Sequence, residues 1–353
     1  MCASRKIFTG IVLLFFVFPV LIAPADEQEI EHRTNLQIQG VYYFGDQQGW
    51  NTDSGIAPIS YEVVEKEQLT HRQNDPGREL GTTWGSVKAQ AVLSHFITLP
   101  FLRAPGPLFS GNNIEVKFMG ELSPVSLNAT AAVKLTPIAF INAAIGAKIG
   151  TGWSFFGLFN GLGRNLPGEE YTAPLHEPLS GIVADIYASA TFQFDAAAIW
   201  PGEWHHIVTQ LTPSIHWRGY TGAGPDVAWE YEADGGMNFN GFKLRGSYFL
   251  GYQMPIALNT IGILLETDQY LGEVAEKSPI AAGGWGSDFV EVTFSPVANI
   301  TLSQSTSLSI LIQFQNARDY TKETIGNRYF EYREYKGTYI DLYRIVFIFG
   351  ANL

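Results

Sequence analysis

The chain has 353 residues and a formal net charge of −12 at pH 7, from 22 basic and 34 acidic residues. This acidic balance argues against nucleic acid as a partner. Hydrophobic residues make up 46% and aromatic residues 14% of the chain, which also contains 36 glycines. That composition favours strands and turns over helices, and it is not that of a helical membrane protein.

Residues 1–25 have the three parts of a cleaved secretory signal peptide. A positive start, an apolar centre and a small-residue cleavage site follow one another at Arg5 and Lys6, residues 11–22 and Ala23-Pro24-Ala25. The apolar run is shorter than the ~20 residues that a spanning helix needs, so a retained anchor is the weaker alternative.

The one cysteine of the sequence, Cys2, lies in this predicted signal peptide. Residues 26–353 therefore have neither a disulfide nor a thiolate metal site. An exported chain without disulfides indicates a bacterial origin rather than a small disulfide-rich domain. We predict that residues 26–353 form a single domain.

Twelve later stretches alternate between apolar and polar residues, which is the period of a β-strand. In chain order they are 35–45, 86–99, 113–122, the two halves of a hairpin at 126–153, 181–198, 206–220, 237–253, 257–270, 288–302, 307–319 and 338–353. Most reach the about 9–11 residues of a tilted membrane strand. Pro213 lies inside one of them and predicts a bulge or bend there.

The hairpin at 126–153 has the clearest pattern, with its turn at 137–139. One face carries small aliphatic residues together with Ile141 and Ile145, and the other carries Lys134 and Lys148 beside Asn, Thr and Gly. This division suits a strand with lipid outside and a wet lumen inside. The alternative is a half-buried hairpin of a soluble protein.

The connections differ in length according to their position in the chain. Long polar connections follow most odd-numbered strands, at 46–83, 154–180, 221–236, 271–287 and 320–337. Short turns follow most even-numbered strands, at 137–139, 200–204 and 254–256, while 100–112 and 123–125 are exceptions. We predict an all-β fold: an antiparallel up-and-down transmembrane β-barrel of about 12 strands, with 10 or 14 as alternatives, short periplasmic turns and long extracellular loops.

The last strand carries a further pattern. One face holds Tyr343, Ile345, Phe347, Phe349, Ala351 and Leu353. This resembles the terminal assembly signal of Gram-negative outer-membrane β-barrel proteins, which usually end in Phe or another aromatic residue where this chain has Leu353. The resemblance implies an outer-membrane location, contact with outer-membrane lipid and recognition by the barrel assembly machinery. The long-chain fatty-acid channels are a weaker resemblance, because they carry more strands and an N-terminal hatch.

Charged residues collect on the polar face of the predicted strands. This predicted lumen lining comprises Lys88, Glu115, Lys117, Glu121, Lys134, Lys148, Asp185, Asp195, Arg218, Lys243, Arg245, Glu266, Glu291 and Arg344. Such a mixed-charge lining predicts a passive pore for small solutes. The alternative is a lumen closed by internal ion pairs, in a surface barrel whose loops at 46–83 and 154–180 bind an external ligand.

Six tryptophans lie near the ends of predicted strands, where an aromatic girdle meets the membrane interface. They are Trp153, Trp200, Trp204 and Trp217, with Trp229 and Trp285 as further members.

Two weaker patterns concern chemistry. Ser214 and His216 share a strand face, and an outer-membrane phospholipase uses a Ser–His pair on its exterior. Here the pair is predicted to face inward, and the sequence assigns no third partner, so we predict that the chain is not an enzyme. His205 and His206 point to opposite faces, so they cannot both join His216 as metal ligands. We predict no cofactor and no metal.

Overall fold

The computed structural model describes residues 30–43, 86–155, 159–164, 175–176, 178–224, 227, 229–232, 238–272, 289–320 and 335–353. The predicted signal peptide and the 46–83 loop lie outside these residues. Among the described residues, no helix is both long enough and apolar enough to cross a membrane.

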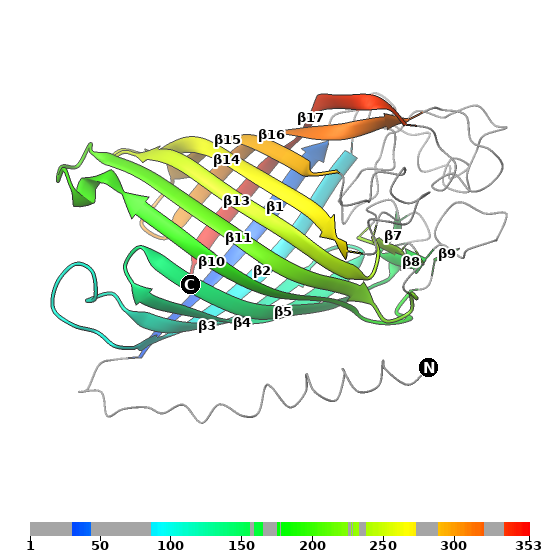
Figure 1. The fold of residues 1–353 in the computed structure, drawn as a ribbon, viewed down its shortest axis with the longest axis horizontal. Coiled ribbons are helices and arrows are strands. Elements are labelled where there is room, and N and C mark those ends of the chain that lie inside the picture. Colours follow the sequence, from blue (N-terminus) through cyan, green and yellow to red (C-terminus); the bar gives the residue numbers. More distant parts are fainter. Residues whose placement is uncertain are drawn as a thin grey trace.

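Twelve long strands form a closed antiparallel barrel in the described part of the chain (Figure 1). They are β1 (Glu31–Tyr43), β2 (Ser86–Pro100), β3 (Asn113–Leu122), β4 (Ser126–Ile138), β5 (Ile141–Gly152), β10 (Val183–Asp195), β11 (His206–Tyr220), β13 (Gly241–Gln253), β14 (Leu258–Leu271), β15 (Glu291–Thr301), β16 (Thr306–Tyr320) and β17 (Tyr335–Asn352). Each pairs with the strands before and after it, and β1 pairs with β17 to close the cylinder. The predicted up-and-down barrel is confirmed.

The two faces of the wall differ as the alternation predicts. On β5, Ile141, Ile145 and Ile149 are 42%, 59% and 51% exposed. On the inner face of β4, Ser126 and Asn128 are buried. Burying one such aliphatic side chain is worth about 1.5–3 kcal/mol, so an exterior lined with them needs lipid around it. The soluble-hairpin alternative is wrong.

The strands alternate in direction, so the two kinds of connection lie at opposite ends of the barrel. Connections that follow β1, β3, β5, β11, β14 and β16 share one end, which we call the loop end. Those that follow β2, β4, β10, β13 and β15 share the other, the turn end. Asn35 pairs with Asn352, which places both ends of the barrel chain at the turn end.

The irregularities of the strand register lie away from Pro213. The register of β11 is unshifted at Pro213, which faces Gly246 of β13, while the ladder to β10 omits the proline. Of the bulge or bend predicted there, the bulge is therefore wrong. A register shift occurs instead in β17, where Gln313 pairs with Arg344 but Phe314 pairs with Leu342. The extra residue in β17 is Tyr343. It points to the inner face of the wall, whereas the alternation of the sequence places it on the outer face.

Candidate functional site in the barrel lumen

A network of charged side chains crosses the inner wall from β10 to β14. Nη1 of Arg245 lies 3.1 Å from Oδ2 of Asp185, and its Nε lies 3.1 Å from Oδ2 of Asp268. Nζ of Lys243 donates to the same Asp268 oxygen at 2.8 Å. The strand register produces this network, because Arg245 is directly opposite Asp268. Two carboxylates thus share two cations.

Ser214 and His216 join this network. Oγ of Ser214 lies 3.0 Å from Nε2 of His216, and Nδ1 of His216 lies 2.7 Å from Oδ1 of Asp185. The ring of Tyr187 stacks on the imidazole at 5.4 Å between centroids. Asp185 is therefore the third partner that the sequence did not assign. It comes from β10, two pairs away from His216 in the β10–β11 ladder.

A cavity of about 370 Å³ opens beside Ser214. Its walls come from β11, β13, β14, β15, β16 and β17, and nearly all of its lining side chains are polar or charged. They are those of Thr212, Ser214, Arg245, Ser247, Glu266, Thr267, Asp268, Glu291, Thr293, Gln315, Tyr343 and Arg344. Oδ1 of Asp268 is buried at this wall and makes no hydrogen bond to any described residue. The cavity therefore presents a polar wall of mixed charge to a solute, while this oxygen itself is covered by protein atoms.

Opposite charges also pair on the wall formed by β3, β4 and β5. Nζ of Lys134 lies 2.8 Å from Glu115, and Lys148 pairs with Glu121. These lysines are 38% and 35% exposed along their side chains, so solvent reaches them. Lys117 lies over the ring of Phe96 at 5.9 Å.

The remaining residues of the predicted lumen set divide between the wall and the rims. Arg344 donates to Gln313, whose amide also contacts Ser295 at 3.0 Å and Glu266 at 3.4 Å. Asp195 accepts a hydrogen bond from His206 at 2.6 Å at the turn end. The side chain of Lys88 is not among those that the structure describes. The predicted lining therefore falls into three groups. The central network joins Asp185, Lys243, Arg245 and Asp268, the solvated network joins Lys134 and Lys148 to their glutamates, and the third group consists of contacts at the rims.

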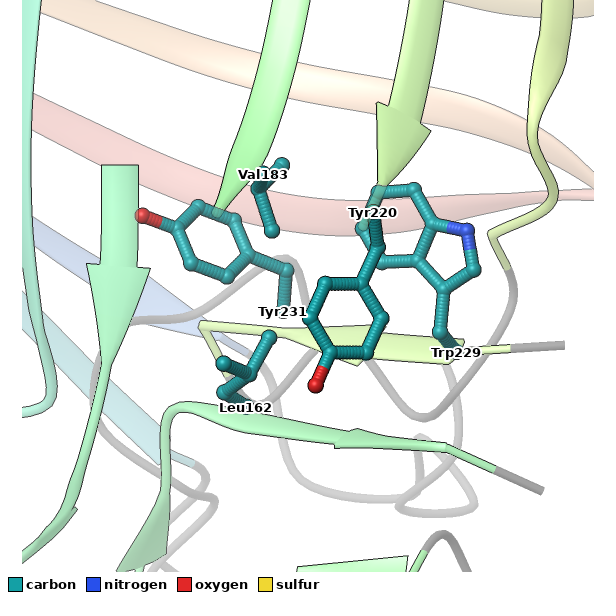
Figure 2. Packing of buried hydrophobic residues seen from close by; sticks show 5 residues of the cluster. All are labelled: Leu162, Val183, Tyr220, Trp229 and Tyr231. Atoms are coloured by element: carbon teal, nitrogen blue, oxygen red, sulfur yellow. The ribbon is translucent and has the colours of Figure 1, made fainter. Parts of the chain in front are cut away.

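A folded segment lies inside the loop end, and we call it the mouth cap. It consists of β8 (Leu162–Arg164) and β9 (Leu175–His176) from the connection after β5, and β12 (Trp229–Tyr231) from the connection after β11. These three strands form a small sheet. Figure 2 shows its apolar cluster, in which cap residues pack against two wall residues: Leu162, Trp229 and Tyr231 against Val183 and Tyr220.

Hydrogen bonds tie the mouth cap to the inner face of β4. The hydroxyl of Tyr231 donates to Oδ1 of Asn128 at 2.7 Å. Oε1 of Glu232 accepts from Ser126 at 2.7 Å and from Asn128 at 2.8 Å. Burial and the adjacent carboxylate of Glu232 raise the pKa of Tyr231 above its ordinary value, so it stays a neutral donor. A Cβ on Gly150 would overlap Oδ1 of Asn128 and the hydroxyl of Tyr231, so a larger residue there would displace this hydrogen bond.

The tryptophans of the predicted girdle have different surroundings. Trp200 and Trp204 are 64% and 50% exposed at the turn end, and Trp217 is 37% exposed on the outer face of β11. Nε1 of Trp153 donates to the carbonyl oxygen of Pro124 at 2.8 Å. Trp229 is fully buried in the mouth cap, so its placement in a girdle was wrong. Trp285 lies outside the described residues.

The residues of the predicted assembly signal do not all share one face. Phe347 and Phe349 are exposed on the outer face of β17, and Leu353 is 75% exposed. Ile345 is half-buried. Tyr343 is buried and lines the cavity, because the register shift turns it inward. Its inclusion in the exposed apolar face was wrong.

The histidines considered for a metal do not meet. His216 contacts Asp185 in the central network, His206 contacts Asp195 at the turn end, and Nδ1 of His205 contacts the carbonyl oxygen of Trp200 at 3.2 Å. The described residues contain no group of three or more His, Cys, Asp or Glu side chains placed to hold a metal ion.

The wall decides the class of protein. Its strands close on themselves, its outer face is apolar, and its inner face carries hydrogen-bonded charges. This is a transmembrane β-barrel.

Sequence comparisons and structural comparisons give different outcomes. No family model and no curated protein matches the sequence. The chain is similar to a FadL homologue from Pseudomonas aeruginosa, at 12% identity and a TM-score of 0.31, over 91% of this chain and 90% of that one. A structure described as "Asymmetric conductivity of engineered proteins" is similar at 6% identity and a TM-score of 0.23, over 92% of this chain and 100% of that one. At such low similarity, neither protein's role transfers to this barrel.

Proposed function

We propose that this barrel is a channel for small hydrophilic solutes in the outer membrane. The observation that carries the proposal is the polar cavity of about 370 Å³, enclosed by a wall whose outer face is apolar. Cations and carboxylates line it together, which suits solutes that carry hydroxyl or mixed charged groups. Outer-membrane lipid and the barrel assembly machinery are the partners that this location requires.

The mouth cap has a defined part in this function. It lies against the inner face of β4 and β10 at the loop end, so a solute passes between the cap and the opposite wall. Glu232 is its main polar anchor, because one of its oxygens accepts from both Ser126 and Asn128. Loosening this anchor widens the entrance.

The same cap supports the second candidate, a plugged barrel whose loops bind an external ligand. A cap with a packed apolar cluster presents a fixed surface to the outside rather than a mobile one. In that case the cap closes the lumen, and the solute path ends beneath it.

Single-channel recording in planar bilayers separates the two candidates. We expect stepwise conductance from the purified barrel and a larger step from Glu232→Ala, because the cap loses two hydrogen bonds. Glu203→Ala, which changes an exposed carboxylate in the turn after β10, is the matched control. Membranes that stay closed with both the wild-type protein and Glu232→Ala contradict the channel and favour the plugged barrel.

A further inference from the structure

Three side chains on the inner wall stand in the order nucleophile, base and orienting acid. Ser214 Oγ lies 3.0 Å from His216 Nε2, and His216 Nδ1 lies 2.7 Å from Asp185 Oδ1. Both distances are within the reach that nucleophilic catalysis requires. We propose that Ser214, His216 and Asp185 form the catalytic triad of a hydrolase that cleaves short, hydrophilic carboxylic esters inside the barrel.

The strands hold this geometry rigidly. Ser214 and His216 are two residues apart on β11, so both point inward and lie next to each other. Asp185 reaches His216 from β10, whose register with β11 is continuous from Val183 to Ser189. The stacked ring of Tyr187 fixes the plane of the imidazole. A site on regular strands keeps its geometry better than one on loops.

The contacts also set the protonation of the imidazole. Asp185 accepts at Nδ1, which places the ring proton there and leaves the Nε2 lone pair toward Ser214. Ser214 Oγ has a second, longer contact of 3.3 Å with the carbonyl oxygen of Arg245. The shorter contact with Nε2 is the one through which the serine loses its proton.

The charged groups around the triad contact one another without Ser214. Arg245 and Lys243 contact the carboxylates of Asp185 and Asp268 at 3.1 Å or less, and Arg218 is directly opposite Asp185 in the β10–β11 ladder. The serine contributes no charge to this network, yet its oxygen lies at the cavity wall and on the imidazole.

The cavity indicates the class of substrate. Its lining contains Tyr343 but no aliphatic side chain larger than those of threonine, so it offers no slot for a long acyl chain. Polar lining side chains such as Ser247, Thr293 and Gln315 can form hydrogen bonds with hydroxyl groups of the ligand. A short acyl group on a hydroxylated alcohol fits these features.

Donors for the developing negative charge flank the nucleophile. Arg245 is directly opposite Ser214 in the β11–β13 register, and both line the cavity. Thr212 precedes Ser214 on the same face and lines the cavity as well. A guanidinium or hydroxyl aimed at the oxyanion stabilises the tetrahedral intermediate.

The reaction needs only the ester and water. Ser214 Oγ bonds to the acyl carbon while its proton passes to Nε2 of His216. The carbon–oxygen bond to the alcohol then breaks, and the alcohol leaves with that proton. Water attacks the acyl-serine, gives one proton to Nε2, and releases the carboxylic acid as the proton returns to Ser214. This activity departs from the prediction that the chain is not an enzyme, and it does not depend on solute conductance.

Covalent labelling tests the proposal on the full-length barrel in detergent. Diisopropyl fluorophosphate forms an oxygen–phosphorus bond with an activated serine and releases fluoride. We expect modification of Ser214, located by peptide mass spectrometry, and hydrolysis of p-nitrophenyl acetate by the same sample. Ser214→Ala and His216→Asn should abolish labelling and lower hydrolysis by at least ~10²-fold.

Ser189→Ala is the matched control, because Ser189 is an inward residue directly opposite Ser214 in the β10–β11 ladder. It should be labelled like the wild-type protein. Asp185→Asn should retain Ser214 but lower hydrolysis roughly 10²–10⁴-fold, since the imidazole loses its orienting carboxylate. A heat-modifiable gel shift verifies that each variant is folded. No modification of Ser214 in the folded wild-type protein, or equal hydrolysis by Ser214→Ala, overturns the triad. Neither result bears on conductance, so the channel proposal stands or falls separately.

Discussion

The mouth cap and the central network occupy the same lumen but are stabilised by opposite means. In the cap, residues from two connections bury an apolar cluster, with Trp229 at 0% and Leu162 at 1% exposure. In the network, residues on regular strands join through charges, with Lys243, Asp268 and Arg245 at 11%, 26% and 27% side-chain exposure. The cap needs close packing, whereas the network needs register.

This difference has a consequence for how each region can fail. A substitution that shortens a buried apolar side chain removes stability in proportion to the cavity it leaves, and this loss stays within the cluster. A buried charge that loses its partner destabilises every strand that holds the remaining charges. Damage to the cap should therefore leave the barrel folded, whereas damage to the network should weaken the wall itself.

Trp229→Ala gives the largest expected effect on the cap. Removing a fully buried indole costs about 3–5 kcal/mol of local stability, because the surrounding cluster closes only in part. Hydrogen exchange of the amides at 161–163 and 229–232 should become fast while the barrel strands stay protected. Trp204→Ala removes an indole that is 50% exposed and should leave these amides unchanged. Loss of protection throughout the barrel would contradict the independence of the cap.

Asp268→Asn tests the network and should affect the wall instead. The change removes the negative charge to which Lys243 and Arg245 both donate, at 2.8 and 3.1 Å. Breaking a buried pair on one side costs about 3 kcal/mol or more. Urea unfolding in lipid vesicles should show this loss. Asp195→Asn makes the same chemical change at the rim and should lower the free energy of unfolding by less. Equal losses for the two variants would contradict the distinction between the wall and the rim.

Lys134→Met should have the smallest effect of the three. Its pair with Glu115 is 2.8 Å long, but the lysine is 38% exposed and solvent screens the interaction. Pairs of this kind are worth about 0.2–1 kcal/mol. The same urea experiment should place this variant well above Asp268→Asn in stability. If Lys134→Met lowered the free energy of unfolding as much as Asp268→Asn, solvent exposure would not determine how much each ion pair of this lumen contributes to stability.

Some of the site was within reach of the sequence. Symmetric pairing about the predicted turn at 200–204 places Asp185 opposite Gly219, one residue away from its partner Arg218 in the folded sheet. A one-residue error exchanges the two faces of a strand, so the third member of the triad follows only from the register of the folded strands. The inward turn of Tyr343 has a faint mark in the sequence, because the apolar residues of β17 change from even positions at 340 and 342 to odd positions at 345, 347 and 349 across the register shift.

The sequence by itself indicated a closed sheet of about 12 strands and the identity of its two faces, and the structure decided the count. It could do so because period-two alternation is a local property, and each strand shows which residues face lipid. Only the tertiary structure decided which inward residues meet, that Trp229 is buried in a cap, and that Ser214, His216 and Asp185 stand in line. Those contacts depend on register between strands and on how loops fold back, and both join residues that are far apart in the chain.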